Sequence, residues 1–475
     1  MIIVGKKLLG NFPNYIGNHR LHNYKDLHMT DNFFVKNGWL GTIRGGVYYL
    51  YNAVDKEFAV FQSLRNYEAY IGREINTVNI MPDPDFTCET HAAAITLTTN
   101  CNMDCPYCYV KPAGGLAAMS LDGVRAAVHA LGTQTDNDLV IFAWGGEPTQ
   151  NPEALLTMLR TAKSFPNIKV CLVTNGVMDE ALLYKLLKFN NLVFQISFDG
   201  LINHEIQKPL ISKGNSLERM LNSIDTISMV SRRLALRVTV TRSNVQELNS
   251  SLLAIVSKYT NRVMLEHLHT FNGRAIALKD QAPFVEDYVD LIFNIIPLAE
   301  NNGIHVKVLP FDHLRAGGPN NKMNFLNILP NLDVVVSNAI IHPSHPDFSN
   351  LHIGQVVDGN IVYNQEKNTL LTNRYVNNYL AHCQDCFART ICRGSVQRYL
   401  FITNDSFIDW DNLRCQYFIS IIARWMDEMI ERVSEFMQSL GGTDGLVRLL
   451  PPSNKIHYPM FILKGGLSLS YQPLL

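Results

Sequence analysis

The stretch Cys101-Asn-Met-Asp-Cys105-Pro-Tyr-Cys108 places three cysteines within eight residues, directly after the apolar run 94–98. Such a run predicts a buried strand, so the cysteines are expected on the loop at its end. Their spacing lets the three thiols converge on one inorganic centre. Three thiolates leave one iron of a four-iron cluster open, whereas a structural or electron-carrying cluster takes four protein ligands. The stretch therefore predicts an iron–sulfur cluster that can bind a second molecule.

A zinc ion is the alternative occupant of these three thiols. Zinc sites usually contain a Cys-x-x-Cys pair and are closed by a fourth Cys or His. The next such residue downstream is His129, which lies inside a helical pattern. The spacing therefore favours a cluster over zinc.

The Cys-x-x-x-Cys-x-x-Cys spacing, with Tyr107 before the last cysteine, resembles the signature of the radical S-adenosylmethionine (SAM) enzymes. The resemblance implies a [4Fe–4S] cluster held by Cys101, Cys105 and Cys108, with SAM on the open iron and Tyr107 among the cofactor-binding residues. It also implies that an electron from the cluster splits SAM into methionine and a 5′-deoxyadenosyl radical, which takes hydrogen from an unactivated C–H bond.

Strand-like and helix-like segments alternate from residue 92 to about 308, the pattern of a parallel sheet with helical crossovers. The predicted strands are 94–98, 139–143, 168–174, 192–197, 234–241 and 262–268, and the predicted helices are 120–132, 152–163, 179–189, 216–231, 244–258 and 284–302. The fold class is therefore predicted as α/β, a partial (β/α)6 barrel with a small N-terminal β-rich domain and a C-terminal SPASM-like cluster domain. Functional residues are expected at the carboxyl ends of the strands.

The motif Gly145-Gly146-Glu147-Pro148 follows the second predicted strand. Two glycines let the backbone approach a ligand closely, and the carboxylate can accept a hydrogen bond from an ammonium group. By itself this tetrapeptide is most often a turn. One β/α unit after the cysteines, it is similar to the GGEP motif of the family, which implies that Gly145, Gly146 and Glu147 hold the amino group of SAM.

Polar residues also accompany the later strands. Short polar side chains at strand ends suit a ribose, and the resemblance to radical SAM peptide maturases implies SAM contacts from Ser197 and Asp199. Arg237 matches a position that pairs with the SAM carboxylate in relatives, and a solvent-facing arginine is the alternative. Glu266 and His267 lie at the end of the sixth predicted strand and are candidates for facing the substrate; no catalytic base is assigned.

A second cysteine group, Cys383, Cys386, Cys392 and Cys415, lies after the barrel. Four thiols can close one site completely, so a zinc held by four thiolates is an alternative on chemistry alone. The spacing resembles that of the SPASM domain, an auxiliary-cluster module that follows the barrel in many peptide-modifying radical SAM enzymes. This resemblance implies an auxiliary [4Fe–4S] cluster.

A full SPASM domain carries two clusters on seven cysteines, and this chain lacks three of the seven. Asn364 stands at one position, the segment 343–349 contains no cysteine for the second, and Val396 stands at the third. All three positions belong to the cluster nearer the barrel in relatives. We therefore expect two [4Fe–4S] clusters in total, together with SAM.

The predicted domains are a β-rich domain at 1–85, the barrel at 90–308, a bridge with the cluster domain at 309–440, and a C-terminal tail at 441–475. In the first domain, strands are expected at 39–43, 47–51 and 58–61, followed by a helix at 63–74. This domain is interpreted either as a cap on the enzyme or as a leader-peptide recognition module that binds its ligand by strand addition.

The composition narrows the function further. Lys and Arg number 41 against 42 Asp and Glu, which argues against a nucleic-acid partner. No apolar run approaches the ~18 residues of a membrane-spanning helix, and the first residues lack the features of a signal peptide. Nine cysteines without an export signal predict a cytoplasmic protein whose cysteines bind clusters rather than form disulfides.

Together these features predict a radical SAM peptide maturase, an oxidoreductase that crosslinks side chains of a ribosomal precursor peptide through a carbon–carbon, ether or thioether bond. An electron donor such as flavodoxin or ferredoxin is expected as a second partner. The alternatives are a peptide epimerase, a sulfatase-maturing or small-molecule dehydrogenase radical SAM enzyme and, outside enzymes, a zinc-bound scaffold.

Overall fold

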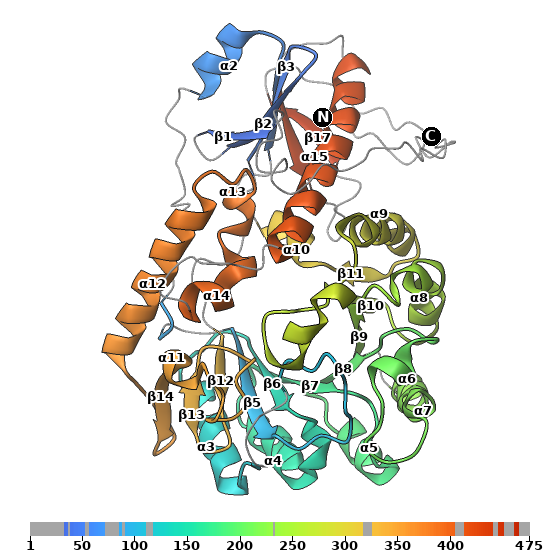
Figure 1. Ribbon diagram of the computed structural model, residues 1–475, viewed down its shortest axis with the longest axis vertical. Helices are drawn as coiled ribbons and strands as arrows, with labels where there is room; N and C mark the ends of the chain where they lie inside the picture. The colour runs from blue at the N-terminus through green and yellow to red at the C-terminus, as the bar shows by residue number, and fades with distance from the viewer. Residues whose placement is uncertain are drawn as a thin grey trace.

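The largest element of the computed structural model is an eleven-stranded sheet with the order β11-β10-β9-β8-β7-β6-β5-β12-β13-β14-β15 (Figure 1). The structure describes residues 33–36, 39–52, 57–71, 85–87, 91–110, 117–230, 233–316, 325–403, 413–439, 445–450 and 460–464. From β11 to β12 all neighbouring strands in this order are parallel. Helices lie along the outer side of these strands, as expected for a barrel-like α/β fold.

The parallel strands are β5 (Ala92–Thr98), β6 (Leu139–Gly145), β7 (Ile168–Thr174), β8 (Leu192–Ser197), β9 (Leu234–Val240), β10 (Arg262–His267), β11 (His305–Lys307) and β12 (Leu326–Ile328). The helices between them include α3 (Leu121–Gly132), α4 (Pro152–Ala162), α5 (Glu180–Leu187), α6 (His204–Gln207), α7 (Ser216–Val230), α8 (Val245–Tyr259) and α9 (Val285–Asn301). The six predicted strands and six predicted helices are confirmed, with ends that differ by no more than two residues.

Local sequence explains where two of these helices begin. The hydroxyl of Ser120 accepts a hydrogen bond from the Gly123 amide at the start of α3, and the Asp179 carboxylate does the same for Leu182 in α5. These side chains satisfy amides that have no partner within the first helical turn. Each helix then returns the chain to the amino end of the next strand, so the carboxyl ends of all parallel strands point to one side.

The sheet extends beyond the predicted six strands. β11 pairs with β10, and β12 pairs with β5 in parallel, followed by the antiparallel strands β13 (Asp333–Val335), β14 (His352–Val357) and β15 (Asn360–Tyr363). Strands of three residues are too short to produce a periodic signal in the sequence. β14 and β15 form a hairpin with Asp358 and Gly359 in its turn.

Helices form most of the region after the barrel. They are α10 (Leu309–Ala316), α11 (Phe348–Leu351), α12 (Gln365–Cys383), α13 (Arg389–Cys392), α14 (Arg398–Thr403) and α15 (Leu413–Ser439). This helical region is consistent with an extra domain after the barrel (Figure 1).

A second sheet contains strands from both ends of the chain. Its order is β1 (Phe33–Lys36), β2 (Trp39–Arg44), β3 (Val47–Asn52), β4 (Glu57–Phe61), β16 (Gly445–Leu450) and β17 (Met460–Lys464), with all neighbours antiparallel. The short helix α2 (Leu64–Ile71) follows β4. The predicted N-terminal strands are thus confirmed, and β1 precedes them at the edge of the sheet.

The expectation of a separate tail at 441–475 needs correction for residues 445–464. Leu446 pairs with Ala59 and Val447 with Phe58, so β16 covers an edge of β4 that would otherwise present unpaired backbone groups. β4 and β16 lie almost at opposite ends of the chain, so local periodicity in the sequence does not indicate that they pair. The other domain limits stay predictions.

The long helix α15 joins this sheet to the barrel. Trp425 packs against the rings of Tyr51 and Phe58, at centroid distances of 4.9 and 6.1 Å. On the barrel side, Arg424 forms an ion pair of 3.1 Å with Asp290 of α9. One helix therefore carries contacts to both units, and its first turn also holds Cys415.

Candidate active site

The loop with Cys101, Cys105 and Cys108 leaves the carboxyl end of β5, where its backbone is joined to the Gly-Gly-Glu motif. The Gly146 amide donates to the carbonyl of Thr98 (2.9 Å), and the Glu147 amide donates to that of Asn100 (2.8 Å). A Cβ atom on Gly145 would lie 2.1 Å from the Thr98 oxygen, and one on Gly146 would lie 2.4 Å from the Asn100 oxygen. Both glycines are therefore required for this close approach.

A second segment, 208–211, fixes the loop from the other side. The Asp104 amide donates to the carbonyl of Pro209 (2.9 Å), and the Ile211 amide donates to that of Asn102 (3.0 Å). Met103 and Leu210 form an antiparallel bridge between these bonds. This pairing could not be predicted from the sequence, because the segment lies between helices and has no periodic pattern.

A third contact closes the end of the loop. The Arg274 amide donates to the carbonyl of Cys108 (3.2 Å), and its guanidinium pairs with Asp104 at 2.7 Å. Gly273, with a φ of +57°, allows this approach, because a Cβ there would lie 2.8 Å from the Cys108 oxygen. Three separate segments thus hold the loop in one conformation.

The thiols of the loop suit an iron–sulfur cluster. Burial raises the pKa of Cys101 to about 12 and that of Cys105 to about 11, so a bound metal would be needed to hold them as thiolates at neutral pH. In the described part of the chain, no group of three or more His, Cys, Asp or Glu side chains is arranged to hold a single metal ion. Three thiols on one loop fit a four-iron cluster that keeps one iron open.

Glu147 is buried, with 1% of its surface exposed, and its carboxylate is engaged by protein donors. One oxygen accepts from the hydroxyl of Thr174 (2.8 Å) and from the amide and hydroxyl of Thr149 (3.1 and 2.8 Å). The other accepts from the amide of Asn175 (2.8 Å). Burial raises the pKa of Glu147, and these four hydrogen bonds oppose the rise. The carboxylate therefore ties the motif to the end of β7.

Asp199 is fully buried and accepts a hydrogen bond from the hydroxyl of Tyr107. Its other oxygen accepts from the amide of Thr239 (3.1 Å), and the ammonium of Lys208 lies 3.5 Å away. The structure thus brings Tyr107 and Asp199, two predicted cofactor-binding residues, into direct contact. Lys208 was not among the predicted residues, although its ammonium lies beside both.

Ser197, the last residue of β8, pairs with Arg237 in the middle of β9. Arg237 forms an ion pair with Glu266 of β10, with a distance of 3.0 Å from Nε to Oε2. The pair is partly buried, and the guanidinium holds the pKa of Glu266 well below its usual range, against the effect of burial. The structure therefore joins a predicted SAM contact to a predicted substrate-facing residue.

His267 lies between the barrel and α15. Its ring stacks on Tyr417 at a centroid distance of 4.3 Å and meets the edge of Tyr288 at 5.7 Å. Nε2 of His269 lies 3.5 Å from the Glu266 carboxylate. Burial lowers the pKa of both histidines, so both rings are neutral at pH 7.

The second cysteine group surrounds a hollow between α12, α13 and α15. Its lining includes Cys383, Cys386, Cys392 and Cys415. The side-chain amide of Gln397 donates to the sulfur of Cys415 at 3.2 Å, a contact that the sequence did not indicate. Four thiols around one hollow, three of them buried and Cys386 partly exposed, fit a closed four-thiolate group with a donor to one sulfur.

The positions that lack the other SPASM cysteines have structural contacts of their own. Asn364 caps α12 by accepting from the amide of Lys367 (2.9 Å). Val396 is buried in the main hydrophobic core. Within 343–349, Asp347 accepts a hydrogen bond of 2.6 Å from the hydroxyl of Tyr399. None of these contacts requires a ligand.

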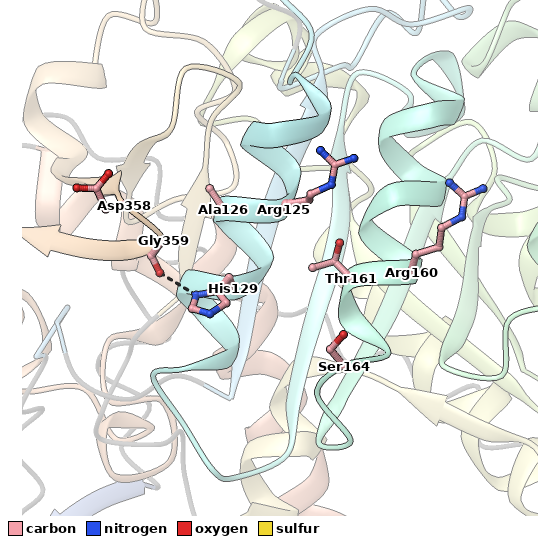
Figure 2. Close-up of a pocket in the computed structure, with 8 residues that line it drawn as sticks. All are labelled: Arg125, Ala126, His129, Arg160, Thr161, Ser164, Asp358 and Gly359. Atoms are coloured by element: carbon pink, nitrogen blue, oxygen red, sulfur yellow. Dashed lines mark hydrogen bonds between the residues drawn. The ribbon is translucent and has the colours of Figure 1, made fainter.

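A further shallow hollow contains none of the cysteines in its lining (Figure 2). It is formed by α3, α4 and the β14–β15 turn, where Nδ1 of His129 lies 3.2 Å from the carbonyl of Gly359. Arg125 and Arg160 line it as exposed side chains. None of the predicted site residues lies in it.

His204 gives a prediction for the dependence of stability on pH. The side chain is fully buried, and neither ring nitrogen has a hydrogen-bond partner in the described structure. Burial lowers its pKa from 6.5 to about 4. The unfolded chain thus binds a proton below pH 6.5 that the folded chain does not bind until about pH 4, so stability falls as the pH decreases through this window. Between pH 7 and pH 5 this group should remove about 2 kcal/mol.

Urea unfolding of the wild type and of His204→Leu at pH 7 and pH 5 measures this contribution. The wild type should lose about 2 kcal/mol more between the two pH values than the variant. Equal losses would show that His204 does not titrate in this way.

The part of the chain that the structure describes contains no helix long and apolar enough to cross a membrane.

Comparison with known proteins gives matches of both sequence and fold. Residues 95–255 match the family described as the Radical SAM superfamily, and no curated protein matches the chain. The structure of anSMEcpe with bound AdoMet is 15% identical, with a TM-score of 0.57, and covers 72% of this chain and 98% of its own. The structure of anSMEcpe with AdoMet and the Kp18Cys peptide is 14% identical, with a TM-score of 0.57 and coverages of 72% and 99%. Streptococcus suis SuiB is 13% identical, with a TM-score of 0.47 and coverages of 73% and 81%.

At these identities the anSMEcpe structures show a likeness of fold alone, and this likeness confirms the predicted fold class. The superfamily match spans β5 to α8 and includes the three-cysteine loop and the Gly-Gly-Glu motif. It supports SAM and one [4Fe–4S] cluster as cofactors. Residues 95–255 therefore resemble the Radical SAM superfamily, within a fold similar to that of anSMEcpe.

Proposed function

We propose that the protein is a radical SAM peptide maturase, which abstracts hydrogen from a ribosomal precursor peptide and joins two of its side chains. The observation that carries this proposal is the combination of a rigidly held three-thiol loop in the barrel with a separate four-thiol site behind it. The first provides an open iron, and the second suits electron transfer. A peptide that loses two hydrogens gives up one as a hydrogen atom and the other as an electron and a proton. We assign the hydrogen atom to the chemistry at the open iron and the electron to the four-thiol site.

Residues of the barrel have different proposed roles at the three-cysteine loop. Cys101, Cys105 and Cys108 hold the [4Fe–4S] cluster, and the backbone at Gly145 and Gly146 approaches the loop closely enough to receive the methionine part of SAM. When bound, the cluster and SAM supply a 5′-deoxyadenosyl radical that removes a hydrogen atom from the peptide. The three backbone contacts to the loop keep this site in one geometry.

The other predicted cofactor residues surround the same end of the sheet. Ser197 is proposed for the ribose, since its hydroxyl lies half-buried at the end of β8. Arg237 keeps its proposed role toward the SAM carboxylate, shared with its ion pair to Glu266. Tyr107 and Asp199 act through each other rather than by separate contacts with SAM.

Crosslink formation also requires that a proton leave the substrate. Burial lowers the pKa of His267 and of His269, so both rings are neutral but weak bases, and no catalytic base is assigned. His267 also contacts Tyr417, two residues from Cys415 in α15. We propose that the auxiliary [4Fe–4S] cluster held by Cys383, Cys386, Cys392 and Cys415 accepts the second electron.

A peptide substrate has support from two observations. A structure with the same fold holds AdoMet together with the Kp18Cys peptide. In addition, β1 lies at the edge of the second sheet and pairs with β2 alone among the described strands. An extended leader peptide could add to this edge by backbone hydrogen bonds. Flavodoxin or ferredoxin is proposed as the electron donor.

The test uses the full chain with its clusters reconstituted under anaerobic conditions. Incubation with SAM, a reductant and the peptide encoded beside the gene should give 5′-deoxyadenosine and a product lighter by two hydrogens. An unchanged mass with a D-residue would indicate the epimerase, and an unchanged peptide without inverted residues would contradict a peptide maturase. A colourless protein that contains zinc would instead support the scaffold.

A further inference from the structure

Lys208 places a buried positive charge beside the three-cysteine loop. Its side chain is 8% exposed, and its ammonium lies 3.5 Å from the carboxylate of Asp199, which is itself fully buried. The same ammonium lies 5.1 Å from the ring centroid of Tyr107, the residue between Cys105 and Cys108. The charge is therefore held by the loop on one side and by the end of β8 on the other.

The backbone next to Lys208 makes this position rigid. Pro209 accepts a hydrogen bond from Asp104, and Ile211 donates one to Asn102, both within the loop. Met103 and Leu210 form a bridge between these two bonds. Main-chain contacts thus fix the backbone at Lys208 against the loop, and the contacts with Asp199 and Tyr107 place its ammonium.

Asp199 does not depend on Lys208 for its hydrogen bonds, since Tyr107 and the amide of Thr239 already donate to it. A buried ammonium costs several kcal/mol in desolvation, and this cost must be offset by negative charge nearby. Asp199 supplies one such charge. The three thiolates add more, and reduction of a cluster bound to them adds one further electron. In a medium of low dielectric, a fixed cation stabilises the reduced state more than the oxidised state.

We propose that Lys208 is a positioning residue of the cluster site, whose fixed charge stabilises the reduced form of the three-thiolate cluster. The inference rests on the proposed function, because it requires a redox-active cluster on this loop. In this proposal Lys208 affects the reduction of the cluster and does not bind substrate or SAM.

The test compares Lys208→Met, which removes the charge at similar volume, with Lys208→Arg, which keeps it. The full chain with reconstituted clusters is titrated potentiometrically without SAM, and the reduced cluster is followed by electron paramagnetic resonance. At a fixed potential, Lys208→Met should lower the ratio of reduced to oxidised cluster about tenfold, a shift of about 59 mV for one electron. Lys208→Arg and the exposed control Lys213→Met should stay within about threefold of the wild type.

Asp199→Asn provides a second route, since it removes the opposite charge. It should raise the reduced fraction, and Asp199→Asn with Lys208→Met should titrate close to the wild type. If Lys208→Met assembles no cluster on the three-cysteine loop, the double variant is compared with Asp199→Asn instead. The ratio of reduced to oxidised cluster should then be about tenfold lower in the double variant. If the midpoint potential is the same with and without Lys208→Met, the proposed role of Lys208 is wrong, whereas the proposed function stands. A wild type without a reducible three-thiolate cluster overturns the proposed function as well.

Discussion

Replacement of Cys105 by alanine should lower the iron content of the reconstituted protein from about eight to about four atoms per chain. The same variant should cleave SAM at the background rate under reducing conditions. Cys105 is one of only three thiols on the loop, and two thiolates do not hold a cubane with an open iron. The four remaining irons belong to the proposed auxiliary site, whose four thiols are untouched. Iron and sulfide analysis together with 5′-deoxyadenosine release measures both effects.

Cys171→Ala is the matched control, because Cys171 is a buried cysteine of β7 outside both groups. It should keep about eight irons and the wild-type rate of SAM cleavage. About twelve irons in the wild type would contradict the count of two clusters. An unaltered metal content in Cys105→Ala would contradict the assignment of the loop itself.

Replacement of Glu147 by alanine should destabilise the protein by roughly 3 kcal/mol or more. The carboxylate accepts four hydrogen bonds from Thr149, Thr174 and Asn175, and it is almost completely buried. Its removal leaves these donors without partners in a site that water does not reach. Urea unfolding of the reconstituted protein, followed by circular dichroism, measures the loss.

Two further variants separate this structural role from the predicted contact with SAM. Glu147→Gln keeps the shape and one oxygen acceptor, so its loss of stability should lie between those of the wild type and Glu147→Ala. Glu153→Ala, on the exposed side of α4, should change stability by less than about 0.5 kcal/mol. Wild-type stability in Glu147→Ala, combined with weaker SAM binding, would show that the carboxylate serves the cofactor instead of the strand ends.

The two predictions differ in how much of their basis was visible in the sequence. Cys105 belongs to a short motif in which spacing alone specifies the chemistry, so its role was predicted without a fold. Glu147 was found by its motif, but its four donors come from the turn after it and from the end of the next strand. The sequence indicated the residue, and only the folded chain shows where its hydrogen bonds go.

The sequence by itself determined the alternation of strands and helices, the two cysteine groups and the strand ends at which polar residues gather. These features are local, since hydrophobic periodicity and short spacings are contained within a few turns of chain. Tertiary structure alone decided the pairing of β16 with β4, the ion pair of Arg237 with Glu266 and the position of Lys208 beside Tyr107 and Asp199. Each of these joins segments that are distant in sequence, and a contact of this kind depends on the packing of the whole chain rather than on any local pattern.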